Sequence, residues 1–291
     1  MKIKNLIYFS LLSVLIALAL YFFLQYLPAA FAGYLVPNPV MFDFGNLSVR
    51  WYGFIIACAA LIAYFISERR LKKISLGDKA DQIIFSALIV GIIGARIGFV
   101  VQNVGYYLDH VAEIFQIWQG GLSIHGAMLG GILALVVCAR MYKTGFIEIA
   151  NAIAPQIMLA GGIGRFGNFF NQEIIGQPLD KYFWKMYVAN MNRPAGFENQ
   201  AFYHPVFLYE SILLLGAFAL YYYLGKKWGN KFGFAYTVIA YGLVRIIVEP
   251  FRIDYSPMLW KLDLAQIASL AIIILGVAVL VCELRLKRRA D

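Results

Sequence analysis

Long apolar runs separated by short polar segments dominate the chain, and this pattern is its first structural signal. Several runs reach 18 or more residues, and about 20 such residues cross a bilayer core as a helix. The runs predict eight membrane-spanning helices, near residues 6–27, 51–68, 82–103, 118–139, 147–172, 206–224, 233–251 and 264–283. We therefore expect an all-α, polytopic membrane protein.

The composition supports this class and excludes others. Hydrophobic residues make up 62% of the chain and charged residues 14%, with a mean hydropathy of +0.71, so a soluble surface could not be assembled. The net charge of +9 does not indicate a nucleic-acid partner, because the basic residues cluster between the apolar runs. Cys58, Cys138 and Cys282 stand alone in separate spans. We expect no disulfide, no metal site and no cofactor.

The basic residues also orient the chain. With the N-terminus inside, the cytoplasmic segments hold most of the Lys and Arg residues, including five between 69 and 79, as the positive-inside rule requires. The longest external segment, about 173–205, carries Gly, Pro, Asn and aromatic residues, and we interpret it as a small extracytoplasmic head. His110 and His204 fall in external segments, and their surroundings indicate no chemistry.

The N-terminal run permits two interpretations. It follows "MKIKN" and precedes "LPAAFAG", as a signal peptide would, but it is longer than the usual apolar core of about 7–15 residues. A retained helix is therefore favoured. We expect residues 1–35 to form an extra N-terminal transmembrane helix (or an uncleaved signal-like segment) and residues 36–291 to form a seven-span core that carries the head.

Three arginines, Arg96, Arg165 and Arg245, lie inside predicted spans. Each costs about 3 kcal/mol at a helix centre, so each needs a partner, water or a function. At about 1.5 Å of rise per residue, all three lie in the external half of the membrane, as do Tyr52 and His125 at the start of inward-running spans. We expect these groups to converge near the external face.

Local spacing sharpens this expectation in the stretch "GGIGRFGNFFNQE". Arg165, Asn168 and Gln172 follow at i, i+3 and i+7, which places them on one face of a helix. The glycines permit close approach of other helices or of a ligand. They also spell GxGxxG, but no βαβ unit surrounds them, so a dinucleotide site is not indicated.

A second constellation lies in "YGLVRIIVEPFR". Tyr241, Arg245 and Glu249 are spaced i, i+4 and i+8, so Glu249 can pair with Arg245. Pro250 forbids a regular helix around Glu249 and predicts a kink or a helix end there.

Structural alternatives remain for each residue. Arg96 is equally explained as a charge that bonds backbone carbonyls. Purely structural ion pairs are the less favoured explanation for Arg165 and Arg245. His125 could be a hydrogen-bonded core histidine, and Tyr52 belongs by default to an interfacial aromatic belt. If the arginines act together, guanidinium groups bind phosphate bidentately, and apolar walls around them suit an external-leaflet phospholipid.

Six blocks together resemble the bacterial phosphatidylglycerol–prolipoprotein diacylglyceryl transferase family over about residues 40–285. They are "RWYGF", "GARIGFV", "WQGGLSIHGAMLGG", "GGIGRFGNFFNQEIIGQP", "YHPVFLYES" and "YGLVRIIVEPFR". The resemblance implies an inner-membrane enzyme with its active site toward the outer half. It would transfer the diacylglyceryl group of phosphatidylglycerol to the lipobox cysteine of a prolipoprotein and release glycerol phosphate, in the first step of lipoprotein maturation.

The resemblance also implies residue roles. Its catalytic residues would be Arg165, Arg245, His125 and Glu249, and its phosphatidylglycerol-binding residues would be Arg165, Asn168, Glu173, Gly176, Tyr52, Tyr241 and Arg96. The nucleophile would be the substrate thiolate, since the thiolate is the reactive form of cysteine. Guanidinium groups would stabilise the phosphate that leaves.

Three positions depart from the family pattern: the block "GARIGF", Gln119 and Pro250. The last leaves the pose of Glu249 open. Two rival functions use the same arginines, a transporter for an anionic substrate and a structural membrane scaffold. Transport commonly uses paired repeats with broken helices, and no repeat is evident in this sequence.

Overall fold

The computed structural model describes residues 17–45, 48–117, 120–228, 231–253, 258–259 and 262–290. Seven of the described helices are long and apolar enough to cross a membrane, at Trp51–Lys72, Gly77–Gln102, Ile124–Met141, Phe146–Asn171, Val206–Lys226, Gly233–Phe251 and Leu264–Arg285. They confirm the predicted all-α, polytopic class. Of the predicted span 6–27, residues 6–16 lie outside the described residues, and the remainder belongs to a shorter apolar helix over Ala17–Ala32.

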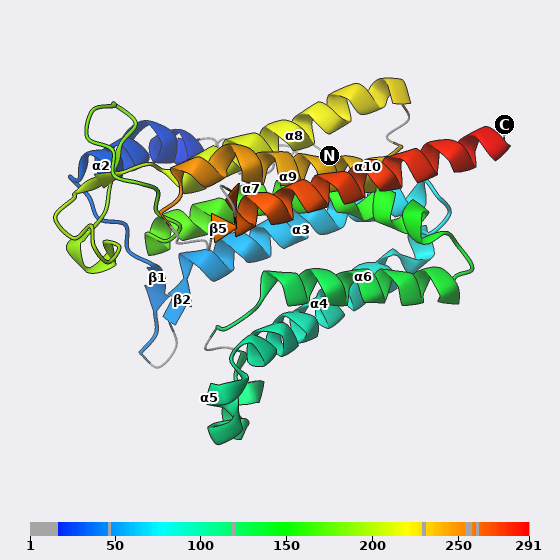
Figure 1. The fold of residues 1–291 in the computed structure, drawn as a ribbon, viewed down its shortest axis with the longest axis horizontal. Coiled ribbons are helices and arrows are strands. Elements are labelled where there is room, and N and C mark those ends of the chain that lie inside the picture. The colour runs from blue at the N-terminus through cyan, green and yellow to red at the C-terminus, as the bar shows by residue number, and fades with distance from the viewer. Residues whose placement is uncertain are drawn as a thin grey trace, which may run out of the picture. The chain divides into compact units, whose positions relative to one another are not determined.

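Helices account for most of the described chain (Figure 1). The α-helices are α2 (Leu27–Ala32), α3 (Trp51–Lys72), α4 (Ala80–Gln102), α5 (Val104–Asp109), α6 (Ile124–Met141), α7 (Phe146–Asn171), α8 (Val206–Trp228), α9 (Gly233–Val248) and α10 (Leu264–Ala290). A π-helical turn, η1 (Phe22–Tyr26), precedes α2, and short 3-10 turns are η2 (Gly77–Lys79), η3 (Val111–Phe115), η5 (Asn190–Asn192) and η6 (Glu249–Phe251).

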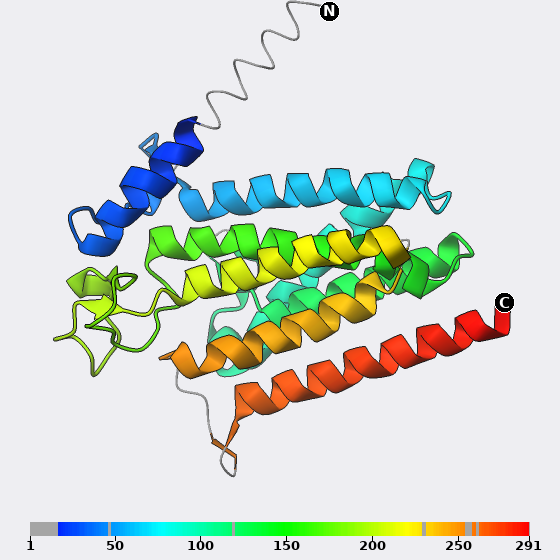
Figure 2. The ribbon, with the colours of Figure 1, turned by 90° about the horizontal axis from the view of Figure 1, so that it is seen from above.

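Strands form three small antiparallel pairs. They are β1 (Val40–Asp43) with β2 (Ser48–Arg50), β3 (Met186–Tyr187) with β4 (Phe202–Tyr203), and β5 (Met258–Leu259) with β6 (Leu262–Asp263). The pair β3–β4 lies in the predicted head, where Met186 opposes Tyr203. The pair β5–β6 leads directly into α10 (Figure 2).

The chain divides into two compact units. Unit 1 comprises Met1–Ala59, Gly161–Gly216 and Tyr241–Ala271, and unit 2 comprises Ala60–Ala160, Ala217–Ala240 and Ile272–Asp291. Five helices, α3, α7, α8, α9 and α10, contribute residues to both units. Unit 1 holds the head, the C-terminal part of α7 and the N-terminal part of α8.

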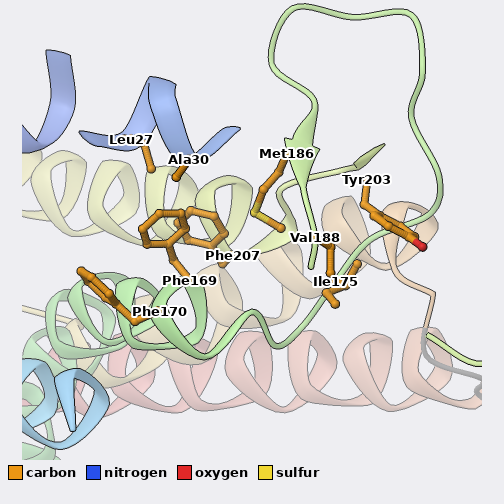
Figure 3. Packing of buried hydrophobic residues seen from close by; sticks show 9 residues of the cluster. All are labelled: Leu27, Ala30, Phe169, Phe170, Ile175, Met186, Val188, Tyr203 and Phe207. Atoms are coloured by element: carbon orange, nitrogen blue, oxygen red, sulfur yellow. The ribbon is translucent and has the colours of Figure 1, made fainter. Parts of the chain in front are cut away.

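The core of unit 1 joins the N-terminal helix to the head (Figure 3). Its buried members are Leu27, Ala30, Phe169, Phe170, Ile175, Met186, Val188, Tyr203 and Phe207. Leu27 and Ala30 of α2 thus share one cluster with α7, α8 and the head, and burying a side chain of the size of leucine or phenylalanine contributes about 1.5–3 kcal/mol. The domain boundary between residues 35 and 36 stays a prediction.

In unit 2, α4 and α6 lie side by side (Figure 1). Glycines make this approach possible: a Cβ atom at Gly94 would meet the carbonyl oxygen of Gly126, and one at Gly126 would meet that of Gly94. The predicted span 118–139 was wrong at its start. The helix begins only at Ile124, because Ser123 has an extended backbone and its Oγ accepts a hydrogen bond from the amide of Gly126 at 3.5 Å. Trp118 and Gln119 lie outside the described residues.

Candidate functional site

A cluster of charged side chains from three helices lies in unit 1, and Glu210 of α8 is its centre. The Glu210 side chain is only 1% exposed, yet three guanidinium groups reach it. Arg165 of α7 forms an ion pair with Oε2, and Nη1 of Arg245 from α9 donates to Oε1 at 3.1 Å. Nη1 of Arg252, just beyond η6, donates to the same Oε1 at 3.1 Å. We call these residues, with Glu249, the arginine cluster.

Glu249 is the second carboxylate of the arginine cluster. It accepts a hydrogen bond from Nη2 of Arg245 at 2.6 Å, and Nε of Arg252 lies 4.0 Å from the same oxygen. The α-helix α9 ends at Val248, and Glu249–Phe251 continue as a 3-10 turn around Pro250. The predicted Arg245–Glu249 pair and the predicted helix end are both confirmed.

Guanidinium groups outnumber carboxylates among the members of the arginine cluster. Three arginines face Glu210 and Glu249. The side chains of Arg165 and Arg245 remain 21% and 19% exposed, so an external anion can reach their guanidinium groups. Such an arrangement is suited to binding phosphate.

Asn168 and Glu173 meet one turn beyond Arg165. Asn168 Nδ2 donates to Glu173 Oε2 at 3.3 Å, and Asn171 Nδ2 donates to Oε1 at 2.8 Å. Glu173 follows the end of α7 at Asn171, and its carboxylate is therefore held by amides of the helix that carries Arg165. The two predicted site residues thus contact each other.

Gln172 does not extend the helical face of Arg165 and Asn168, and this expectation was wrong. The helix stops at Asn171, and Gln172 takes a positive φ of 50°. Its side chain turns into the head, where it donates to the carbonyl of Tyr187 at 3.1 Å and accepts from the amide of Ala189 at 3.0 Å. Gln172 therefore holds the head onto the end of α7.

Gly176 joins the head to the segment that carries Arg252. The two residues form an isolated antiparallel bridge, and the amide of Gln177 donates to the carbonyl of Phe251 at 2.8 Å. A Cβ atom at Gly176 would lie 2.7 Å from the carbonyl oxygens of both His204 and Phe251. Only glycine fits between these backbones, so the contribution of Gly176 is close backbone packing beside Arg252.

His204 lies on the other side of Gly176, beside an apolar cavity of about 410 Å³. Its Nδ1 is 3.0 Å from the hydroxyl of Tyr209, and its ring centroid is 5.2 Å from that of Phe251. Burial lowers the pKa of His204, since the apolar surroundings disfavour the charged imidazolium. The imidazole is therefore neutral near pH 7.

Two predicted tyrosines belong to the same unit. The ring of Tyr52, in the first turn of α3, lies against Gly167, where a Cβ atom would come within 2.5 Å of a ring carbon. This glycine sits between Arg165 and Asn168 in sequence, so the "GRFGN" stretch accepts an aromatic ring on its backbone. Tyr241 is half-buried one helical turn before Arg245 on α9.

Arg96 and His125 belong to unit 2. Arg96 is buried, and its guanidinium donates to four carbonyl groups: those of Ile114 at 2.7 Å, Glu113 at 2.5 Å, Gly120 at 2.9 Å and Gly121 at 3.0 Å. These are the contacts expected if Arg96 is a structural charge that bonds backbone carbonyls. His125 is the second residue of α6 and is exposed. Their roles toward a lipid or a thiol stay predictions.

Two members of the arginine cluster, Glu210 and Arg252, were missed by the sequence analysis. Glu210 is the single acidic residue in the apolar run that forms α8, and an intramembrane carboxylate is itself a signal for a charged partner. Arg252 follows Glu249 at i+3, but the spacing argument stopped at Glu249 and assigned it no role. Both lie within blocks that carried the family resemblance.

Metal ligands and thiols do not form a site in the part of the chain that the structure describes. No group of three or more His, Cys, Asp or Glu residues there could hold a metal ion. Cys58, Cys138 and Cys282 are free thiols, of which Cys138 is buried.

Known proteins resemble this chain over most of its length. Residues 39–282 match the family described as "Prolipoprotein diacylglyceryl transferase". A phosphatidylglycerol–prolipoprotein diacylglyceryl transferase of Thermosynechococcus vestitus is 40% identical over 239 residues, covering 80% of this chain and 88% of the relative. The proteins of the same name from Staphylococcus aureus (38% over 248 residues; 84% and 88% covered) and Fervidobacterium nodosum (35% over 283 residues; 95% and 94% covered) are also similar.

Proposed function

The chain belongs to the prolipoprotein diacylglyceryl transferase family, and from this premise we propose how it works. It transfers the diacylglyceryl group of phosphatidylglycerol to the thiol of a prolipoprotein's lipobox cysteine. The observation that carries the proposal is the arginine cluster, in which three guanidinium groups converge on one buried carboxylate. A transporter for an anionic substrate is not favoured, since the relatives are named as transferases.

The arginine cluster binds the phosphate of phosphatidylglycerol. Before the lipid arrives, Glu210 and Glu249 hold the three guanidinium groups together and offset most of their charge. Arg165 and Arg245 attract the headgroup and present planar N–H pairs that match two phosphate oxygens. Asn168, Glu173, Tyr52 and Tyr241 border the same phosphate, and the backbone of Gly176 keeps Arg252 in place.

The reaction exchanges one bond for another. The sulfur of the substrate thiolate attacks the glycerol carbon that carries the phosphate ester, a C–S bond forms and the C–O bond breaks. Glycerol phosphate leaves with the bonding electron pair on oxygen. Arg165 and Arg245 stabilise this oxygen, because fixed positive groups in a water-poor site act most strongly where charge develops. The thiol proton passes to a base, a role that the family resemblance assigns to His125.

The reaction takes place at the outer half of the bacterial inner membrane. Support comes from the positive-inside distribution of Lys and Arg residues, which directs the segment after α7 outward. This segment pairs with the Phe251–Arg252 segment beside the arginine cluster. The prolipoprotein would therefore meet the site after its signal peptide has reached the membrane.

A reconstituted assay tests the proposed function. The purified full chain is incubated with radiolabelled phosphatidylglycerol and a lipobox peptide, and the thioether product is identified by mass spectrometry. A matched peptide with serine in place of the cysteine serves as the control. We expect product from the cysteine peptide alone. Release of glycerol phosphate without thioether product would contradict the proposal and indicate a lipase instead.

A further inference from the structure

A second apolar cavity in unit 1 lies away from the arginine cluster, between the N-terminal helix and the head. Its volume is about 470 Å³, within the roughly 300–1,000 Å³ of small-molecule sites. Leu27, Phe31 and Ala32 of α2 line one side, and Trp184, Lys185 and Phe202 of the head line the other. Lys185 is the single charged residue among the described residues of the lining.

Lys185 is positioned at this cavity by two contacts and still has N–H donors that can bind an anion. Its Nζ donates to the carbonyl of Asp180 at 3.0 Å and lies 4.1 Å from the centroid of the Phe202 ring. An ammonium group has three donors, so this one has donors to spare. No carboxylate in the described part of the chain forms an ion pair with it. A positive charge over an aromatic wall complements a ligand with an anionic head and an apolar body.

The surroundings of the cavity resemble a membrane interface. Tyr182 and Phe183 are 52% and 92% exposed, and the ring of Tyr182 stacks on Trp184 with 4.7 Å between centroids. Aromatic residues flanked by lysines are typical of the headgroup level of a bilayer. On the helix that leads into α2, Leu18, Leu20 and Leu24 are all at least half exposed, as side chains that face lipid would be.

We propose that this cavity binds an anionic phospholipid, with an acyl chain between α2 and the head and the phosphate beside Lys185. The site is separate from the arginine cluster, and it requires α2. It gives the N-terminal helix a function: α2 completes a lipid-binding site on the head. The inference depends on the chain being a membrane protein and does not depend on the transfer reaction.

Native mass spectrometry of the purified full chain tests the proposal. The protein is equilibrated with equimolar phosphatidylglycerol and phosphatidylcholine, without acceptor peptide, and the retained lipids are counted. Lys185→Gln is expected to weaken phosphatidylglycerol binding by about fivefold, the effect of one basic residue near an anionic headgroup, and to leave phosphatidylcholine unaffected. Ala32→Phe, which fills the cavity, is expected to lower retention as well. Lys181→Gln is the matched control, because Lys181 is in the same loop but does not line the cavity.

An Arg165→Ala background separates the two lipid sites, since it removes binding at the arginine cluster and leaves the cavity intact. In that background, retention of the remaining phosphatidylglycerol is expected to depend on Lys185. Glycerol phosphate, which lacks acyl chains, is expected not to displace this lipid. Equal retention by Lys185→Gln and wild type would overturn the proposal, as would equal losses in Lys185→Gln and Lys181→Gln. A change in lipobox-peptide KM with lipid retention unaltered would assign the cavity to the peptide and also overturn it.

Discussion

Arg96 in unit 2 and the arginine cluster in unit 1 stabilise guanidinium groups within apolar helices by different partners. Arg96 donates to four backbone carbonyls of the segment that follows α4, and among the described residues no carboxylate pairs with it. In the arginine cluster, three guanidinium groups share two carboxylates. In the first arrangement, nearly all N–H donors of Arg96 are bonded to backbone carbonyls of the protein. In the second, Arg165 and Arg245 keep donors and positive charge with which they can bind an anion.

The difference separates a structural arginine from a ligand-binding one. Carbonyl groups carry no net charge, so they fix Arg96 in place without tuning its affinity for an anion. Carboxylates hold arginines reversibly, because an incoming phosphate offers the same bidentate geometry. In the sequence, Arg96, Arg165 and Arg245 are equivalent, because each is an arginine within an apolar run. The structure distinguishes them by the partners that each guanidinium contacts.

The largest expected effect is the loss of activity in Arg165→Ala. This arginine touches only Glu210 among the acids of the arginine cluster, so its removal should spare the Arg245–Glu249 pair and the fold. Loss of one group that stabilises developing charge commonly costs about 100- to 1,000-fold in rate. The measurement is thioether formation per folded molecule. Arg165→Lys should recover little, since lysine lacks the planar fork; near wild-type turnover of this variant would contradict bidentate recognition.

Glu210→Gln should cause the largest loss of stability. The amide would leave three guanidinium groups around a neutral side chain, and removing one partner of a buried ion pair costs about 3–5 kcal/mol. Thermal unfolding in detergent should show a lower midpoint for this variant. In the double variant Glu210→Gln, Arg252→Gln, one cation fewer surrounds the site and part of the loss should be recovered. Purely additive losses would mean that the two side chains are not coupled.

Arg96→Met should lower stability by less than Glu210→Gln and should leave lipid recognition unchanged. The variant would leave the carbonyls of the segment after α4 without their donor, but it would leave no buried charge unpaired, which is the costlier loss in Glu210→Gln. We expect a lower melting temperature with an unaltered KM for phosphatidylglycerol. An unchanged melting temperature with a raised KM would instead support the role implied by the family resemblance.

The sequence predicted the helical architecture because apolar length and charge bias are read directly from composition. It predicted the Arg245–Glu249 pair because that contact lies within one helix at i, i+4 spacing. It missed the position of Glu210 as the centre of the cluster, since that depends on how α7, α8 and α9 pack. Contacts between helices are not encoded in local periodicity.

Errors at helix ends have a similar cause. A 3.6-residue period continued through Gln172 predicted a shared face, but the backbone turns to positive φ there and the side chain binds the head. The start of α6 was placed too early because apolar residues before Ser123 extended the hydrophobic run. Hydropathy identifies residues that avoid water but does not locate the first residue of a helix. The capping residue determines where the helix begins.

The smallest expected effect concerns Glu249, and it tests directly whether a carboxylate of the arginine cluster can be exchanged for a phosphate. Glu249→Ala removes one partner of Arg245, which keeps its hydrogen bond to Glu210, so we expect a loss of about 2 kcal/mol, below that for Glu210→Gln. The increased positive charge should in turn strengthen the attraction for phosphatidylglycerol.

Bound phosphatidylglycerol should therefore raise the melting temperature of Glu249→Ala more than that of wild type, because the phosphate takes the place of the missing carboxylate and a ligand stabilises the state that binds it. Arg96→Met is the comparison variant and should show the wild-type shift, since its partners are carbonyls. The measurement is a melting series with phosphatidylglycerol and, separately, with uncharged diacylglycerol. If the lipid-induced shift is the same in Glu249→Ala and wild type, then Arg245 does not exchange Glu249 for the headgroup, and the distinction drawn between the two kinds of arginine loses its functional meaning.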